Sequence, residues 1–140
     1  MIQARQSCLW LWIALLFVSD PAFAQDGSFT RDGVQLFYRT SGSGTPVIFL
    51  SGGPGFTVDY MVPVGDFVPA SFQRVFYEQR GTGRSKVATM TPENMTIRHV
   101  VADLEALRVH LKQERVFLVG HSWGGMVAMA YGAGHPDRID

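Results

Sequence analysis

The chain has 140 residues, of which 46% are hydrophobic and 17% charged, and twelve basic residues balance twelve acidic ones. This length suits one small domain. A formal net charge of zero, without any basic patch or charge run, excludes the electrostatic surface typical of nucleic-acid-binding proteins.

The first 24 residues have the pattern of a secretory signal peptide. Arg5 supplies a positive charge, Cys8–Val18 is an uncharged apolar run, and Ala22-Phe-Ala24 fits the small residues that precede a cleavage site. The apolar run is well short of the ~20 residues that span a bilayer. We therefore predict cleavage after Ala24 and a secreted or periplasmic protein without stable membrane insertion, the alternative being an uncleaved membrane tether.

The mature chain, residues 25–140, begins with a predicted hairpin over Ser28–Tyr38. It turns at Asp32-Gly33, a dipeptide favoured in two-residue turns. Two short runs with apolar centres, Pro46–Leu50 and Arg74–Glu78, predict further strands. A short helix is expected between them, within residues 59–68.

Residues 96–112 form the clearest predicted helix. Thr96 is a suitable N-cap, and His99 and His110 are interpreted as surface or boundary residues. Residues spaced by three and four make one buried stripe, in which Arg108 is the polar exception: Ile97, Val100, Val101, Leu104, Leu107, Arg108 and Leu111. Because helices and strands alternate after the hairpin, we predict an α/β fold with a mostly parallel sheet flanked by helices.

Val116–Val119 is an apolar run that predicts a strand buried on both faces, and it leads directly into Gly120-His-Ser-Trp-Gly124. Gly-x-Ser-x-Gly between a strand and a helix is typical of a nucleophile elbow, where flanking glycines make room for a strained serine. Residues 126–131 contain few helix breakers and suit the required helix. Ser122 is therefore the predicted catalytic nucleophile.

A serine nucleophile needs a base to take its proton and an acid to orient that base. In this architecture both follow the serine, and the residues after Ser122 include His135, Asp137 and Asp140. A helix of about 11 residues ends about 16 Å from its start, which puts His135 out of reach of Ser122. We expect the acid and the histidine beyond Asp140, so that residues 25–140 form a partial domain truncated after the elbow helix.

Three motifs occur in a fixed order: Ser51-Gly-Gly-Pro-Gly55, Glu78-Gln-Arg-Gly-Thr-Gly-Arg-Ser85 and Gly120-His-Ser-Trp-Gly-Gly125. With them, the chain from about Phe29 onward resembles the amino-terminal half of the α/β-hydrolase fold, in particular the prolyl iminopeptidase-like branch of serine peptidases. The second motif is the most specific to that branch. Two positions depart from the pattern, since the family usually has a loop-bracing histidine at position 51 and aspartate at position 78.

The resemblance implies a serine hydrolase that acts on ester or amide bonds through an acyl-enzyme, and within the branch an aminopeptidase. It also implies an oxyanion hole formed by the backbone N–H groups of Trp123 and Gly53. Related epoxide hydrolases and haloalkane dehalogenases carry aspartate as the nucleophile, so serine at position 122 favours acyl transfer. His121 is interpreted as a packing residue beneath the elbow, not as the base.

Arg80 and Arg84 are interpreted as residues that hold their loop through salt bridges, in preference to binding substrate. No cofactor or metal is predicted, and nucleotide binding is excluded because Gly81-Thr-Gly83 lacks the Gly-Lys-Ser/Thr ending of a phosphate-binding loop. The expected partner is a small-molecule or peptide substrate, which in the family is selected by a cap domain and later loops. Two alternatives stay open: a catalytically inactive fragment, and a non-enzymatic binding module on a hydrolase scaffold.

Overall fold

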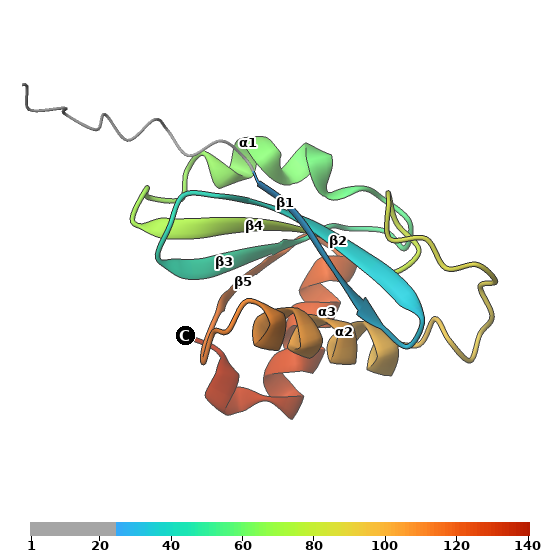
Figure 1. Cartoon of the computed structure of the whole chain (residues 1–140). Coiled ribbons are helices and arrows are strands. Elements are labelled where there is room, and N and C mark those ends of the chain that lie inside the picture. Colours follow the sequence, from blue (N-terminus) through green and yellow to red (C-terminus); the bar gives the residue numbers. More distant parts are fainter. Residues whose placement is uncertain (1–24) are drawn as a thin grey trace, which may run out of the picture.

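The computed structural model of the chain describes residues 25–140, and the predicted signal peptide lies outside the described residues. A five-stranded sheet forms its centre (Figure 1). The strands are β1 (Gln25–Arg31), β2 (Val34–Ser41), β3 (Thr45–Leu50), β4 (Phe72–Glu78) and β5 (Phe117–Gly120). They lie side by side in the order β1-β2-β4-β3-β5.

The sheet is mixed, as predicted. β1 and β2 form an antiparallel hairpin, β2 continues antiparallel to β4, and β4, β3 and β5 are parallel to one another. Arg31 pairs with Val34, so the hairpin turn has the two expected residues. Asp32 and Gly33 have φ of 48° and 73°, the left-handed conformations that a tight two-residue turn requires.

Helices cover both faces of the sheet (Figure 1). The helical elements are the 3₁₀-helix η1 (Val58–Met61), α1 (Val62–Gly65), α2 (Ile97–His110), α3 (Trp123–Gly134) and the 3₁₀-helix η2 (Pro136–Arg138). Strand residues alternate between the two sides. Val47 and Phe49 of β3 pack with η1, whereas Ile48 and Leu50 pack with α2 and α3.

The predicted helix over residues 96–112 is present as α2, with Thr96 as its N-cap. The Thr96 hydroxyl accepts a hydrogen bond from the His99 backbone N–H at 3.4 Å. His99 is half-buried and His110 exposed, as expected. The buried stripe begins at Val100, since Ile97 in the first turn is 39% exposed.

β5 corrects one prediction. Its apolar residues Phe117–Val119 are half-buried, not buried on both faces. Among the described strands β5 lies at an edge of the sheet, and β3 is its neighbour on one side. On the other side Val116 forms a parallel bridge with Ile139, because Val116 N–H donates to the Arg138 carbonyl and Asp140 N–H donates to the Val116 carbonyl.

Glu105 joins the two helices that cover one face of the sheet. The Tyr131 hydroxyl donates to Glu105 Oε2 at 2.6 Å, and the Arg108 guanidinium lies 2.5 Å from Glu105 Oε1. The hydrogen bond from Arg108 is the main reason that the pKa of Glu105 falls to about 2, and Tyr131 lowers it further. Burial raises the pKa of Tyr131, whose hydroxyl therefore stays a donor.

This carboxylate predicts a pH dependence of stability. The pKa of Glu105 is about 2 in the folded chain against an ordinary 4.5. Its stabilising effect is therefore complete above an ordinary carboxyl pKa and is lost as pH falls through the folded value. We expect Glu105→Gln to flatten the fall in the free energy of unfolding over that pH range, measured by urea denaturation of the full chain. Glu114→Gln, at an exposed carboxylate, is the matched control. An E105Q profile as steep as that of the wild type would contradict the prediction.

Candidate active site

Ser122 lies between β5 and α3 in a strained backbone conformation. Its φ of 51° and ψ of −112° fall in the region that favours glycine. Such a conformation costs roughly 1–3 kcal/mol and persists where the surrounding structure enforces it. The Ser122 carbonyl accepts hydrogen bonds from Gly125 and Met126 and so begins α3. The serine therefore lies at a sharp strand-to-helix turn.

The glycines on either side of Ser122 are required by close backbone contacts. A Cβ on Gly120 would lie 2.4 Å from the Gly124 carbonyl oxygen, and one on Gly124 would lie 2.1 Å from the Leu50 carbonyl oxygen. The His121 N–H also donates to the Leu50 carbonyl at 3.1 Å. The turn therefore packs closely against its own backbone and the end of β3. This packing leaves no room for side chains at the two glycines of Gly-x-Ser-x-Gly.

The loop after β3 is braced by buried polar side chains. The Ser51 hydroxyl donates to the Phe56 carbonyl at 2.9 Å, and the Gln79 side chain donates to the Ser51 carbonyl at 3.0 Å. Phe56 N–H closes a turn on the Gly53 carbonyl, and Gly53 has a φ of 55°. Ser51 thus braces the loop itself, although the resemblance implies a histidine there. Gln79 was missed by sequence reasoning, although it lies in the branch-specific motif.

A cavity of about 260 Å³ lies against this loop and the start of α3. Its lining residues are Gly53, Pro54, Gly55, Gln79, Arg80, Gly81, Thr82, Met90, Met95, Val100 and Trp123. The backbone N–H groups of Gly53 and Trp123 donate no hydrogen bond to any residue that the structure describes. The N–H of Gly52, in contrast, is bound by the Tyr60 hydroxyl. Of the two adjacent loop glycines, Gly53 is therefore the one with an available donor.

The structure places the predicted nucleophile beside this cavity. Ser122 is exposed and directly precedes Trp123, which lines the cavity. The strand order brings the two predicted oxyanion donors together, because β3 ends in the loop of Gly53 and the adjacent β5 ends in the elbow. Loop, elbow and cavity thus meet at the carboxyl ends of the parallel strands.

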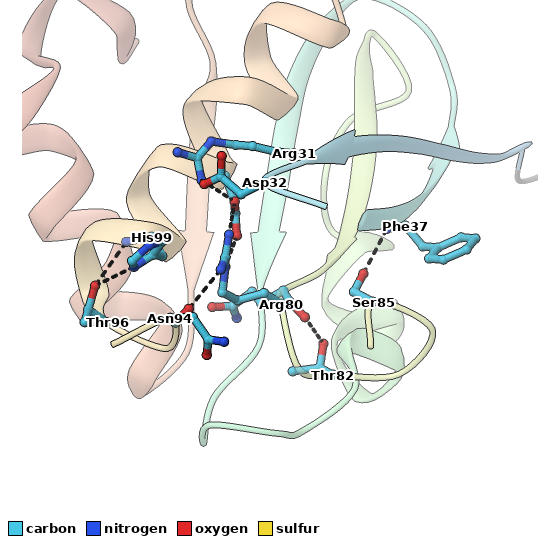
Figure 2. A network of polar contacts seen from close by, with 11 residues as sticks. Arg31, Asp32, Phe37, Arg80, Thr82, Ser85, Asn94, Thr96 and His99 are labelled. Atoms are coloured by element: carbon cyan, nitrogen blue, oxygen red, sulfur yellow. Dashed lines mark hydrogen bonds and ion pairs between the residues drawn. The ribbon is translucent and has the colours of Figure 1, made fainter. Parts of the chain in front are cut away.

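Arg80 lines the cavity, but its guanidinium forms an ion pair with Asp103 of α2. Their contacts are 2.5 Å from Arg80 Nε to Asp103 Oδ2 and 2.7 Å from Nη2 to Oδ1, both in the interior. Arg31 reaches the same carboxylate at 2.9 Å. Arg80 also donates to the Asn94 carbonyl (Figure 2). The hydrogen bond to Asp103 raises the pKa of Arg80.

Arg84 forms ion pairs with Glu78, at 2.8 Å, and with Asp26, at 2.9 Å. The Arg84 backbone N–H donates to the same Glu78 carboxylate. The interpretation of both loop arginines as salt-bridge partners is therefore correct. Glutamate at position 78 performs this role although the family pattern has aspartate.

Within residues 25–140, no histidine is hydrogen-bonded to the Ser122 hydroxyl. His135 caps the far end of α3, about 18 Å of helix away at 1.5 Å per residue, and its ring contacts Tyr131. The His121 side chain is exposed, in contrast to the expected packing beneath the elbow. It points instead to Tyr60, whose hydroxyl lies 2.9 Å from His121 Nδ1.

Neither a metal centre nor a membrane-spanning helix occurs among residues 25–140. These residues contain no cluster of three or more side chains suited to binding a metal ion. None of their helices combines the length and the apolar character needed to cross a bilayer.

The mixed sheet and the strand–elbow–helix turn define the class of protein. Residues 45–140 match the α/β hydrolase fold family, and the chain belongs to that family. Within this family, the sequence falls in the prolyl iminopeptidase-like branch, and it matches part of the length of the members of that branch.

The curated relatives support this assignment. The proline iminopeptidase of Arabidopsis thaliana is 39% identical over 108 residues, which are 74% of this chain and 27% of that protein. The proline iminopeptidase of Neisseria meningitidis is 38% identical, over 75% of this chain and 34% of that protein. The chain spans about a third of the length of the curated relatives it matches.

Two solved structures illustrate the fold. A proline iminopeptidase-related protein from Thermus thermophilus is similar with a TM-score of 0.75 and 27% identity, over 81% of this chain and 41% of that one. An epoxide hydrolase from Vigna radiata has a TM-score of 0.73 and 27% identity, over 83% of this chain and 37% of that one. The similarity therefore extends to more than one kind of hydrolase.

Proposed function

We propose that the chain is the amino-terminal part of a serine hydrolase that cleaves ester or amide bonds through an acyl-enzyme. The observation that carries the proposal is the arrangement around one cavity. Strained Ser122 lies beside it, and Gly53 and Trp123, from two separate loops, line it with backbone N–H groups that donate no hydrogen bond among residues 25–140. A serine with two adjacent donors suits attack on a carbonyl group.

In the proposed reaction, Ser122 Oγ attacks the carbonyl carbon of the substrate while a base takes its proton. The N–H groups of Gly53 and Trp123 stabilise the oxyanion of the tetrahedral intermediate, and losing one such donor typically lowers the rate by about 10²–10³. The intermediate collapses, the base returns the proton to the leaving group, and the acyl group stays on Ser122. Water, deprotonated by the same base, then releases the acid and restores the serine.

The base and its orienting acid are proposed to lie beyond Asp140, in a longer protein. Three observations support this division. No histidine among the described residues is hydrogen-bonded to Ser122, the match covers only about a third of the length of the curated relatives, and Ile139 already pairs at the edge of the sheet beside β5. The alternative functions, an inactive fragment or a binding module, require that no such residues complete the site.

The proposed substrate class is a peptide or small amide from which an amino-terminal residue is removed. The similarity to proline iminopeptidases supports this class. The cavity agrees with it, because Pro54, Met90, Met95 and Val100 offer an apolar surface and the charge of Arg80 is neutralised by Asp103. An uncharged apolar side chain fits such a cavity better than a charged one.

A fluorophosphonate probe tests the proposal, because it reacts with activated serines. We expect the protein from the complete reading frame to carry one adduct, located at Ser122 by mass spectrometry, and Ser122→Ala to carry none. The 140-residue chain alone should label weakly, because an alcohol without a base is a poor nucleophile. A folded, complete protein that does not label would support the binding module and overturn the proposed hydrolase.

We also propose that the mature protein is secreted or periplasmic and begins at Gln25. The apolar run and the Ala22-Phe-Ala24 site support this. Amino-terminal sequencing or intact mass of protein recovered outside the cytoplasm is expected to show a chain that starts at Gln25. A mature protein that retains Met1 would contradict the prediction.

A further inference from the structure

Tyr60 of η1 lies between the two loops that carry the proposed oxyanion donors. Its hydroxyl accepts a hydrogen bond from the Gly52 backbone N–H and lies 2.9 Å from His121 Nδ1. The Tyr60 and His121 rings meet edge to face, with centroids 5.7 Å apart and an angle of 78°. One side chain from a third element thus touches both loops.

The contact leaves no room for another side chain. A Cβ on Gly52 would lie 2.6 Å from His121 Nδ1 and 3.1 Å from the Tyr60 hydroxyl. The neighbours of Tyr60 on η1, Val58 and Met61, are buried in the core, so that η1 is fixed against the sheet. Tyr60 itself is 43% exposed and contributes little to that core.

The residues that Tyr60 holds are the ones next to the proposed catalytic groups. Gly52 directly precedes Gly53, and His121 lies between Gly120 and Ser122. A shift of the Gly52 peptide moves the Gly53 N–H, and a shift of His121 moves the elbow and with it the Trp123 N–H. The spacing between the two donors therefore depends on the bridge through the Tyr60 hydroxyl.

We propose that Tyr60 is a positioning residue that sets this spacing, a role that rests on the proposed function. The hydroxyl suits the task because it both accepts and donates. It accepts the Gly52 N–H, and it donates to a neutral His121 Nδ1 or accepts from a protonated one. Oxyanion donors act only when they are fixed before the charge develops, and a misplacement of about 1 Å can cost about 10²-fold in rate.

The test is Tyr60→Phe in the protein from the complete reading frame, with Tyr38→Phe as a matched control. Tyr38 makes the same kind of contact elsewhere, since its hydroxyl lies 3.0 Å from His110 Nε2 and the rings meet edge to face at 5.7 Å. We expect Tyr60→Phe to lower kcat by about 10- to 100-fold with KM within about twofold. Fluorophosphonate labelling should slow by a similar factor, and the Gly52 amide should exchange with deuterium faster. Tyr38→Phe should change none of these.

The outcomes separate this inference from the proposed function. If the wild type does not label at Ser122, the proposed function fails, and the positioning role fails with it. If the wild type labels but Y60F and Y38F have equal kcat, the positioning role alone is overturned. If Y60F loses both kcat and Tm while Y38F keeps both, Tyr60 has a merely structural role, and the proposal is also overturned.

Discussion

Replacing Ser122 by alanine in the protein from the complete reading frame is expected to lower turnover by about 10⁴–10⁶, in line with the loss of other triad serines. The reason is that the proposed covalent step disappears while the proposed oxyanion donors of Gly53 and Trp123 remain. Substrate binding should change little, because the substitution removes one hydroxyl group and leaves the residues that line the cavity unchanged. Steady-state kinetics of purified wild-type and variant proteins measure both quantities.

Two further variants make this prediction specific. Ser43→Ala, at an exposed serine of the turn before β3, is the matched control and should keep full turnover. Ser122→Gly should be as inactive as Ser122→Ala but more stable, because glycine adopts a φ of 51° without strain. Turnover within tenfold of the wild type for S122A would show that the nucleophile is elsewhere.

Replacing Asp103 by alanine is expected to destabilise the fold by about 3–5 kcal/mol, the usual cost of removing one partner from a buried ion pair. Asp103 is fully buried, and Arg80 is 3% exposed. The substitution therefore leaves the Arg80 guanidinium in the interior without its counter-charge. It also releases a positive charge at the wall of the cavity. Urea denaturation of the full chain, followed by circular dichroism, measures the loss.

Asp59→Ala is the matched control for this prediction. Asp59 also forms an ion pair with an arginine, Arg39, but the Asp59 side chain is 66% exposed. Exposed pairs contribute about 0–1 kcal/mol, so its loss should be small. Equal destabilisation by the two substitutions would mean that burial does not determine the strength of the Asp103 interaction.

The features that the sequence predicted correctly are local ones. The turn at Asp32-Gly33 and the cap at Thr96 depend on the conformations and hydrogen bonds of a few successive residues. The elbow is local as well, because the crowding between Gly120 and Gly124 arises within five residues. Such features can be predicted because the interactions that cause them join residues close together in the sequence.

The features that sequence reasoning missed depend on strand order. Gln79 follows β4 and reaches Ser51 because β3 and β4 are neighbours in the sheet. Tyr60 meets His121 across 61 positions of sequence, and nothing in either local pattern points to the other. The prediction that β5 is buried on both faces was wrong for the same reason, since an apolar run has the same composition at an edge as at the centre of a sheet.

The bridge between Val116 and Ile139 lies at the edge of the described sheet where further parallel pairing can occur. Among residues 25–140, β1 forms the opposite margin of the sheet, whereas Ile139 pairs in parallel beside β5. The contacts that fix the loop of Gly53 and the start of α3 lie among earlier residues, such as the turn of Phe56 on Gly53 and the close approach of Gly124 to Leu50. A strand that paired at this edge would therefore extend the sheet without changing the contacts that hold the proposed nucleophile and the proposed oxyanion donors.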